Sequence, residues 1–163
     1  MTIPHRPSLE LGAVQKIRKV AVLVAIVGLV GLALVSQSVD GVDGQWHERV
    51  ESVGFVAMIL SIGGRAWCSL YIGGRKKAEI VDRGPYSITR NPLYVFSYIG
   101  ALGIGMQSGS VVIGIGFVLA ALIVFYLTVQ REEAFLEREF GAVYTAYKAR
   151  TPRFWPRFSL WRD

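Results

Sequence analysis

The feature that most constrains this chain is a stretch of forty residues, 91–130, that contains no Asp, Glu, Lys or Arg. A helix that crosses the apolar part of a bilayer needs about 20 such residues, so the stretch is long enough for two. Its middle reads GMQSGS, a cluster of turn-forming residues. We therefore expect a helical hairpin with arms at about 93–107 and 110–129. The first arm is short, so it must begin at the membrane interface or pack against protein.

Two further apolar segments precede the hairpin. Residues 20–39 follow a basic cluster, and residues 50–72 are interrupted by Arg65. The first could be read as a cleaved signal peptide, but it is long and lacks a small-x-small cleavage site. In lipid every backbone polar group must be satisfied within the segment. We therefore predict an all-α polytopic membrane bundle of about four helices. It forms one domain over 1–163, with two N-terminal spans in 17–72 and a motif-bearing core in 73–157.

The basic residues predict how this bundle is oriented. All of them except Arg49 and Arg65 fall in the N-terminal segment, in the 73–91 loop or after residue 130, which lie on one side of the predicted bundle. By the positive-inside rule, both termini and that loop are cytoplasmic. Topology and anionic lipid account for the net charge of +6, so we expect no nucleic-acid partner. The short chain, with one cysteine and minimal loops, predicts an integral protein of a bacterial inner membrane.

Cysteine and histidine usage argues against a metal centre or a disulfide. Cys68 is the single cysteine, so no intramolecular disulfide or thiolate zinc site can form. His5 and His47 are predicted to lie on opposite sides of the membrane, which disfavours a histidine metal site. A catalytic cysteine would need a histidine nearby, and neither histidine is placed for that role.

The segment GPYSITRNPLYVF, residues 84–96, leads into the hairpin. Asn91 is a favoured helix N-cap, and Pro92 suits the first helical position, where its missing N–H costs nothing. The free N–H groups of such a helix start, beside Arg90, would form an anion site. The alternative is a plain cap, with Arg90 contacting lipid headgroups.

A second unusual segment, REEAFLEREFGAVYTAYKARTPRFWP, covers residues 131–156. We expect it to form an amphipathic helix at the interface or beneath the bundle. Its apolar stripe comprises Leu136, Phe140, Val143, Tyr144 and Tyr147. Glu132 and Glu133 point about 100° apart on a helix, so at most one faces a given site. A carboxylate near an anion-binding helix start would suit a ligand that carries both signs of charge. The alternative is a solvated charge run in which basic neighbours offset Glu133.

These two segments and the hairpin between them resemble the isoprenylcysteine carboxyl methyltransferase and phospholipid methyltransferase superfamily of integral membrane enzymes. The family pattern is G-x-Y-x-x-x-R-H-P-x-Y, a helical hairpin, E-E-x-x-L, F-G-x-x-Y-x-x-Y and a basic-aromatic tail ending in proline. The matching residues are Gly84, Tyr86, Arg90, Pro92, Tyr94, Glu132, Glu133, Leu136, Phe140, Gly141, Tyr144, Tyr147 and Pro156. The chain departs from the pattern at Asn91, where the family has histidine. Asparagine cannot titrate near neutrality, so a mechanism that needs an imidazole there is in doubt.

The resemblance implies S-adenosylmethionine as methyl donor, bound between the hairpin and the tail helix. Arg90 or the helix start at Asn91 and Pro92 would suit its carboxylate, and Glu132 or Glu133 its ammonium or ribose. Aromatic walls for the adenine or the sulfonium would come from Tyr86, Tyr94, Tyr144 and Tyr147.

The acceptor is expected to be a lipidic or lipidated molecule. A carboxylate acceptor needs only a cation to position it, for which Arg65, Arg131 and Arg153 are candidates. An amine acceptor must lose a proton, which Glu132 or Glu133 could take.

Several alternatives stay open at this stage. The acceptor could be a phospholipid amine, the chain could be a distant membrane reductase using a nicotinamide cofactor, or it could be a non-catalytic partner in a membrane assembly. Arg65 either extends its side chain to the interface or contacts a ligand. The glycines of the hairpin favour close helix packing and would permit a homodimer.

Overall fold

The computed structural model describes residues 27–28, 30–31, 44–73 and 79–163, and the regular elements of this part are all helical. They are α2 (Gln45–Ile72), α3 (Pro85–Ile88), α4 (Pro92–Met106), α5 (Val111–Phe140), α6 (Ala142–Arg150) and the 3-10 helix η1 (Phe158–Leu160). The predicted all-α class is therefore confirmed. The predicted span at 20–39 lies almost entirely outside the described residues.

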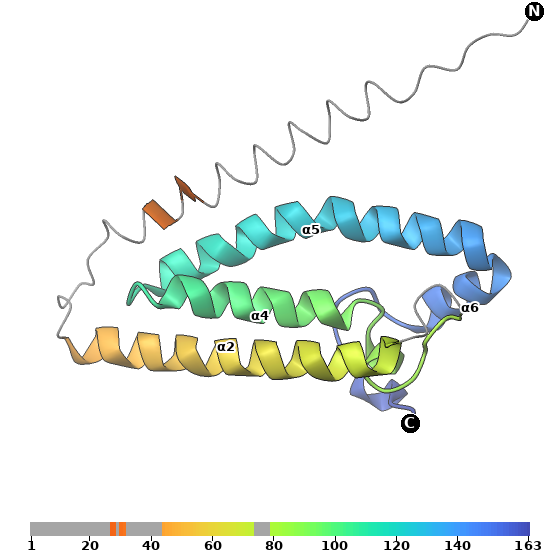
Figure 1. Ribbon diagram of the computed structural model, residues 1–163, viewed down its shortest axis with the longest axis horizontal. Helices are drawn as coiled ribbons and strands as arrows, with labels where there is room; N and C mark the ends of the chain where they lie inside the picture. The colour runs from red at the N-terminus through yellow and green to blue at the C-terminus, as the bar shows by residue number, and fades with distance from the viewer. Residues whose placement is uncertain (1–26, 29, 32–43, 74–78) are drawn as a thin grey trace, which may run out of the picture.

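Three of the predicted spans correspond to described helices. α2 and α5, with 28 and 30 residues, are each long and apolar enough to cross a bilayer, whereas α4 has 15 residues. Figure 1 shows α4 lying between α2 and α5, and both flanking helices pack against it. The short arm of the hairpin thus packs against protein, as expected. The total of four spans remains a prediction.

Glycines allow α4 to approach both of its neighbours closely. A Cβ atom on Gly103 would lie 2.6 Å from the carbonyl oxygen of Gly54 on α2. A Cβ atom on Gly105 would lie 2.6 Å from the Cα atom of Gly114 on α5. Across the same α2–α4 contact, Ser61 Oγ donates a hydrogen bond to the carbonyl of Phe96 at 2.7 Å. The predicted role of glycine in helix packing is confirmed at these positions.

The hairpin turn lies where the sequence predicted it. Gln107 follows α4, Gly109 has a φ of +70°, and Ser110 caps α5 by accepting a hydrogen bond from the amide of Ile113 at 3.4 Å. A positive φ is a conformation that glycine adopts without steric cost. Gly109 is therefore needed in this turn because of its positive φ.

The single amphipathic helix predicted for 131–156 is wrong. Arg131 to Phe140 instead form the last ten residues of α5, which ends at Gly141 with φ +50° and ψ −122°. This conformation is accessible to glycine and strained for other residues, so the chain turns there into the separate helix α6. As a result Val143, predicted in the apolar stripe, is 64% exposed, while Tyr144 and Tyr147 are buried.

The chain after α6 follows an irregular path that we call the hook, residues 151–162. It is hydrogen-bonded along the segment that leads into α4. The amide of Arg90 donates to the carbonyl of Pro152 at 2.9 Å, that of Arg157 to Ile88 at 3.0 Å, and that of Gly84 to Arg162 at 2.7 Å. These backbone hydrogen bonds fix the hook to the segment that precedes α4.

Gly103→Ala should destabilise the protein, because its new methyl group would lie too close to the backbone of α2. Overpacking of this kind typically costs about 1–3 kcal/mol. Gly63→Ala on α2 is the matched control, because a Cβ atom there meets no atom within 4 Å. Thermal unfolding in detergent, followed by tryptophan fluorescence, should show a lower Tm for Gly103→Ala and an unchanged or higher Tm for the control. Equal melting temperatures would contradict the close packing described for α2 and α4.

Candidate functional site

A cavity of about 310 Å³ lies where the segment leading into α4 faces the second half of α5 and α6. All nine residues predicted to hold a cofactor line it. The full lining comprises Ile72, Glu79, Ile80, Val81, Tyr86, Arg90, Asn91, Pro92, Leu93, Tyr94, Glu132, Glu133, Phe135, Leu136, Tyr144 and Tyr147. The fold thus brings together residues from both sequence segments that the hairpin separates.

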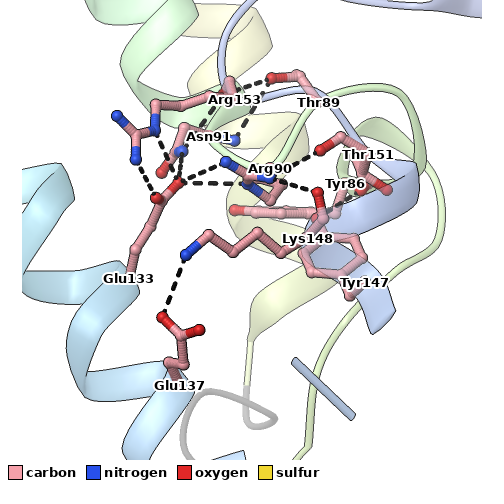
Figure 2. Close-up of polar contacts among 10 residues, drawn as sticks. All are labelled: Tyr86, Thr89, Arg90, Asn91, Glu133, Glu137, Tyr147, Lys148, Thr151 and Arg153. Atoms are coloured by element: carbon pink, nitrogen blue, oxygen red, sulfur yellow. Dashed lines mark hydrogen bonds and ion pairs between the residues drawn. The ribbon is translucent and has the colours of Figure 1, made fainter. Parts of the chain in front are cut away.

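Glu133 is the centre of a buried charge cluster at this cavity (Figure 2). Its side chain is 5% exposed and lies between two guanidinium groups. Arg90 donates to Oε1 at 3.2 Å from Nε, and Arg153 donates to Oε2 at 2.6 Å from Nη2. Asn91 donates to Oε1 at 3.2 Å. The hydrogen bond with Glu133 raises the pKa of Arg153. We call Arg90, Asn91, Glu133 and Arg153 the Glu133 cluster.

The Arg90 guanidinium donates hydrogen bonds to several protein groups. Besides contacting Glu133, its Nη1 atom donates to the carbonyls of Lys148 at 2.7 Å and Thr151 at 3.0 Å. The side chain is 9% exposed. Arg90 therefore joins the start of α4 to the end of α6 and to the hook. The anion-binding role expected for this residue stays a prediction.

Asn91 occupies the N-cap position of α4, but its side chain does not cap the helix. The helix start predicted at Asn91 and Pro92 is confirmed, but the Asn91 side chain does not bond the helix amides: its Nδ2 donates to Glu133 and to the carbonyl of Arg153 at 3.3 Å. The backbone of Asn91 has φ −126° and ψ 52°, and its carbonyl accepts from the amides of Tyr94 and Val95. An amide donor keeps this arrangement without titrating.

Glu132 points to a different part of the cavity from Glu133. It is exposed, and its Oε2 atom accepts a hydrogen bond from the Tyr94 hydroxyl at 3.0 Å. The two neighbouring carboxylates thus have different partners, which agrees with the expected angle between adjacent helical residues. Glu132 is the more accessible acidic group of the pair.

Tyrosines form the aromatic part of the wall. Tyr147 donates from its hydroxyl to the carbonyl of Tyr86 at 2.7 Å. Tyr86 is 8% exposed, and its own buried hydroxyl has no hydrogen-bond partner in the described structure. Burial raises the pKa of Tyr144 to about 12 and also raises the pKa of Tyr86, so both hydroxyls stay protonated at neutral pH. A buried hydroxyl without a partner at a cavity wall indicates a place where a ligand atom can form the missing bond.

Three other predicted site residues do not line the cavity. Arg65 donates to the carbonyl of Leu93 at 3.1 Å and to the Ser97 hydroxyl, so it links α2 to the first turns of α4. Arg131 is exposed on α5. Arg153 donates a hydrogen bond to Glu133, which lines the cavity, but Arg153 itself does not line it.

Sequence reasoning missed several contributors to the site. The apolar wall residues Ile72, Ile80 and Val81 carry no chemical signal in the sequence. Thr89 could have been found, because it lies inside the matched motif. Its hydroxyl donates to the carbonyl of Arg153 at 3.0 Å and so fixes the hook.

The sequence of the chain matches one family model and two named proteins. The family model described as phospholipid methyltransferase matches residues 51–143. The chain is 38% identical over 112 residues to the nickel-cobalt-cadmium resistance protein NccN of Alcaligenes xylosoxydans xylosoxydans, covering 69% of this chain and 52% of that protein. It is 38% identical over 121 residues to the cobalt-zinc-cadmium resistance protein CzcN of Cupriavidus metallidurans, covering 74% and 56%. The chain thus spans about half the length of these relatives.

Glu133→Gln should destabilise the protein strongly, because it leaves two guanidinium groups without their carboxylate. Removing one partner of a buried ion pair typically costs ~3–5 kcal/mol. Glu137→Gln is the matched control, one turn further along α5. Its pair with Lys148, at 3.1 Å, has side chains 45% and 37% exposed, and such surface pairs contribute ~0–1 kcal/mol. Thermal unfolding of both variants measures the difference. A similar small Tm change in both would contradict the central role of Glu133.

Proposed function

Because the chain belongs to the phospholipid methyltransferase family, we propose that it is a membrane enzyme that transfers a methyl group from S-adenosylmethionine to a lipidic or amphiphilic acceptor. The reaction would take place at the cytoplasmic face of the membrane. The observation that carries the proposal is the cavity between α4, α5 and α6. It is lined by every residue that the matched motif would assign to the donor.

The wall of the cavity fits the chemistry of this donor in most respects. Small-molecule sites usually measure about 300–1,000 Å³, and a volume of about 310 Å³ lies at the lower end of that range. Tyr86 and Tyr94 offer aromatic faces, which attract a sulfonium cation, and Glu132 adds an accessible negative charge. The Tyr86 hydroxyl offers a hydrogen bond that no group in the described part of the chain takes.

The Glu133 cluster then acts on the donor indirectly. Among the described lining residues Arg90 is the one cation, and its hydrogen bonds hold α6 and the hook. We therefore assign Arg90 and Glu133 to keeping the wall in place. Tyr86, Tyr94 and Glu132 are the residues that contact the ligand.

Methyl transfer requires little covalent help from the protein. The donor, when bound, supplies an electrophilic methyl group, and the protein aligns the reactants and excludes water. For an amine acceptor Glu132 is the better base, because it is exposed whereas Glu133 lies between two arginines. For a carboxylate acceptor Arg153 is the better-placed cation, because its side chain is 36% exposed beside the cluster.

The names of the two relatives favour a second candidate function. Both are called metal resistance proteins, and such a role is compatible with a non-catalytic subunit of a membrane assembly. Within the described ranges, no three His, Cys, Asp or Glu side chains are grouped to hold a metal ion. Donor binding separates the two candidates, because only the enzyme requires it.

Tyr86→Phe should weaken binding of S-adenosylhomocysteine without unfolding the protein. The variant loses a buried hydroxyl that has no hydrogen-bond partner among the described residues, and a typical hydrogen bond contributes ~0.5–1.5 kcal/mol, about 2- to 12-fold in Kd. Tyr98→Phe is the matched control. Its hydroxyl is also buried without a described partner, but it lies outside this cavity. Isothermal titration calorimetry on detergent-purified protein measures both.

Absence of binding to folded wild-type protein would overturn the methyltransferase proposal and favour the assembly subunit. Binding that is weakened equally in both variants would retain the donor but remove Tyr86 from its contacts. If donor binding is found, incubation of membrane extracts with labelled donor would then identify the acceptor.

A further inference from the structure

Part of the hook lies beside the first two turns of α4. The ring of Phe154 lies 5.9 Å from the ring of Tyr98, measured between centroids. Tyr98 is the seventh residue of α4. At 1.5 Å per residue it lies about 9 Å along the helix axis from Pro92. The hook then turns back, and the amide of Arg157 bonds to the carbonyl of Ile88 before the start of α4.

Two large aromatic side chains stand out from this part of the hook. Trp155 is 86% exposed and Phe158 is 75% exposed, although neither belongs to an apolar helix that could span a bilayer. Arg157, between them, is also exposed. By contrast Trp161, at the end of the hook, stacks on Trp67 of α2 with ring centroids 5.8 Å apart. The hook is thus fixed at its end and exposes aromatic and basic groups in its middle.

We propose that hook residues 155–158 dock on the surface of an anionic bilayer, with Trp155 and Phe158 at the boundary between headgroups and acyl chains. Three observations support a lipid surface as the partner. The hook lies beside the first two turns of an apolar helix, at the depth where such a boundary is expected. Tryptophan is enriched at this depth in membrane proteins. Arg157 supplies positive charge, which anionic headgroups attract.

The same residues connect this surface to the candidate site. Arg153 donates to Glu133, and the carbonyl of Thr151 accepts from Arg90 (Figure 2). The carbonyl of Pro152 accepts from the Arg90 amide. Displacement of the hook from the bilayer would therefore act on the Glu133 cluster. The proposed docking does not depend on the proposed reaction, because it concerns the position of the hook alone.

The test measures how deeply the hook inserts. Cys68 is the only cysteine, so Cys68→Ala gives a background for single labels. Trp155→Cys and Phe158→Cys are each labelled with an environment-sensitive fluorophore in the full-length protein. The labelled proteins are then placed in nanodiscs of phosphatidylcholine with or without phosphatidylglycerol. Glu139→Cys, at an exposed position near the end of α5, is the control for a water-facing label. Brominated lipids serve as quenchers.

We expect quenching at positions 155 and 158 to be at least twofold greater than at 139. It should increase when phosphatidylglycerol is present, and Arg157→Gln should reduce that increase. Quenching at 155 and 158 that equals the control would overturn the proposal. Quenching that does not respond to phosphatidylglycerol would overturn the anionic part of it. Neither readout uses a methyl donor, so failure here is distinct from failure of donor binding.

Discussion

The structure around the candidate site depends on one buried carboxylate, that of Glu133, held between Arg90 and Arg153. Burying a charge is costly unless several hydrogen bonds replace its water, and here the bonds come from two separate parts of the chain, the start of α4 and the hook. Neither of these parts can satisfy Glu133 alone. The start of α4, the second half of α5 and the hook must therefore assemble together, which explains why residues far apart in sequence form one unit.

This arrangement divides the matched motif into two groups. The charged residues Arg90 and Glu133 pair with each other and hold the wall, while Tyr86, Tyr94 and Glu132 line the cavity, the last two joined by a hydrogen bond. A wall whose guanidinium is already paired repels a cationic ligand less than a free arginine would. The internal ion pair is thus compatible with a site whose open groups are aromatic and acidic. That combination suits a sulfonium better than an anion.

The sequence predicted the elements of the fold better than their connections. The charge-free run at 91–130 was sufficient to predict the hairpin, and the family resemblance pointed to nine of the sixteen residues that line the cavity. The end of α5 at Gly141 was missed. Helix-forming residues flank this glycine on both sides, and its positive φ, which ends the helix, leaves no signal in the sequence. The partner of Asn91 was missed because local rules favour capping, whereas the chain gains more by bonding Glu133 across the bundle. Such long-range partners have no local signal.

The hook shows how a short irregular segment can serve two environments. Residues 151–157 form no regular helix, and bends occur at 153–155. Arg153 reaches the carboxylate of Glu133, while the next residue, Phe154, reaches the ring of Tyr98 on α4. On a helix these two side chains would point about 100° apart. The irregular chain after α6 thus supplies an arginine to the buried cluster and, with the next residue, a phenylalanine to the apolar helix α4.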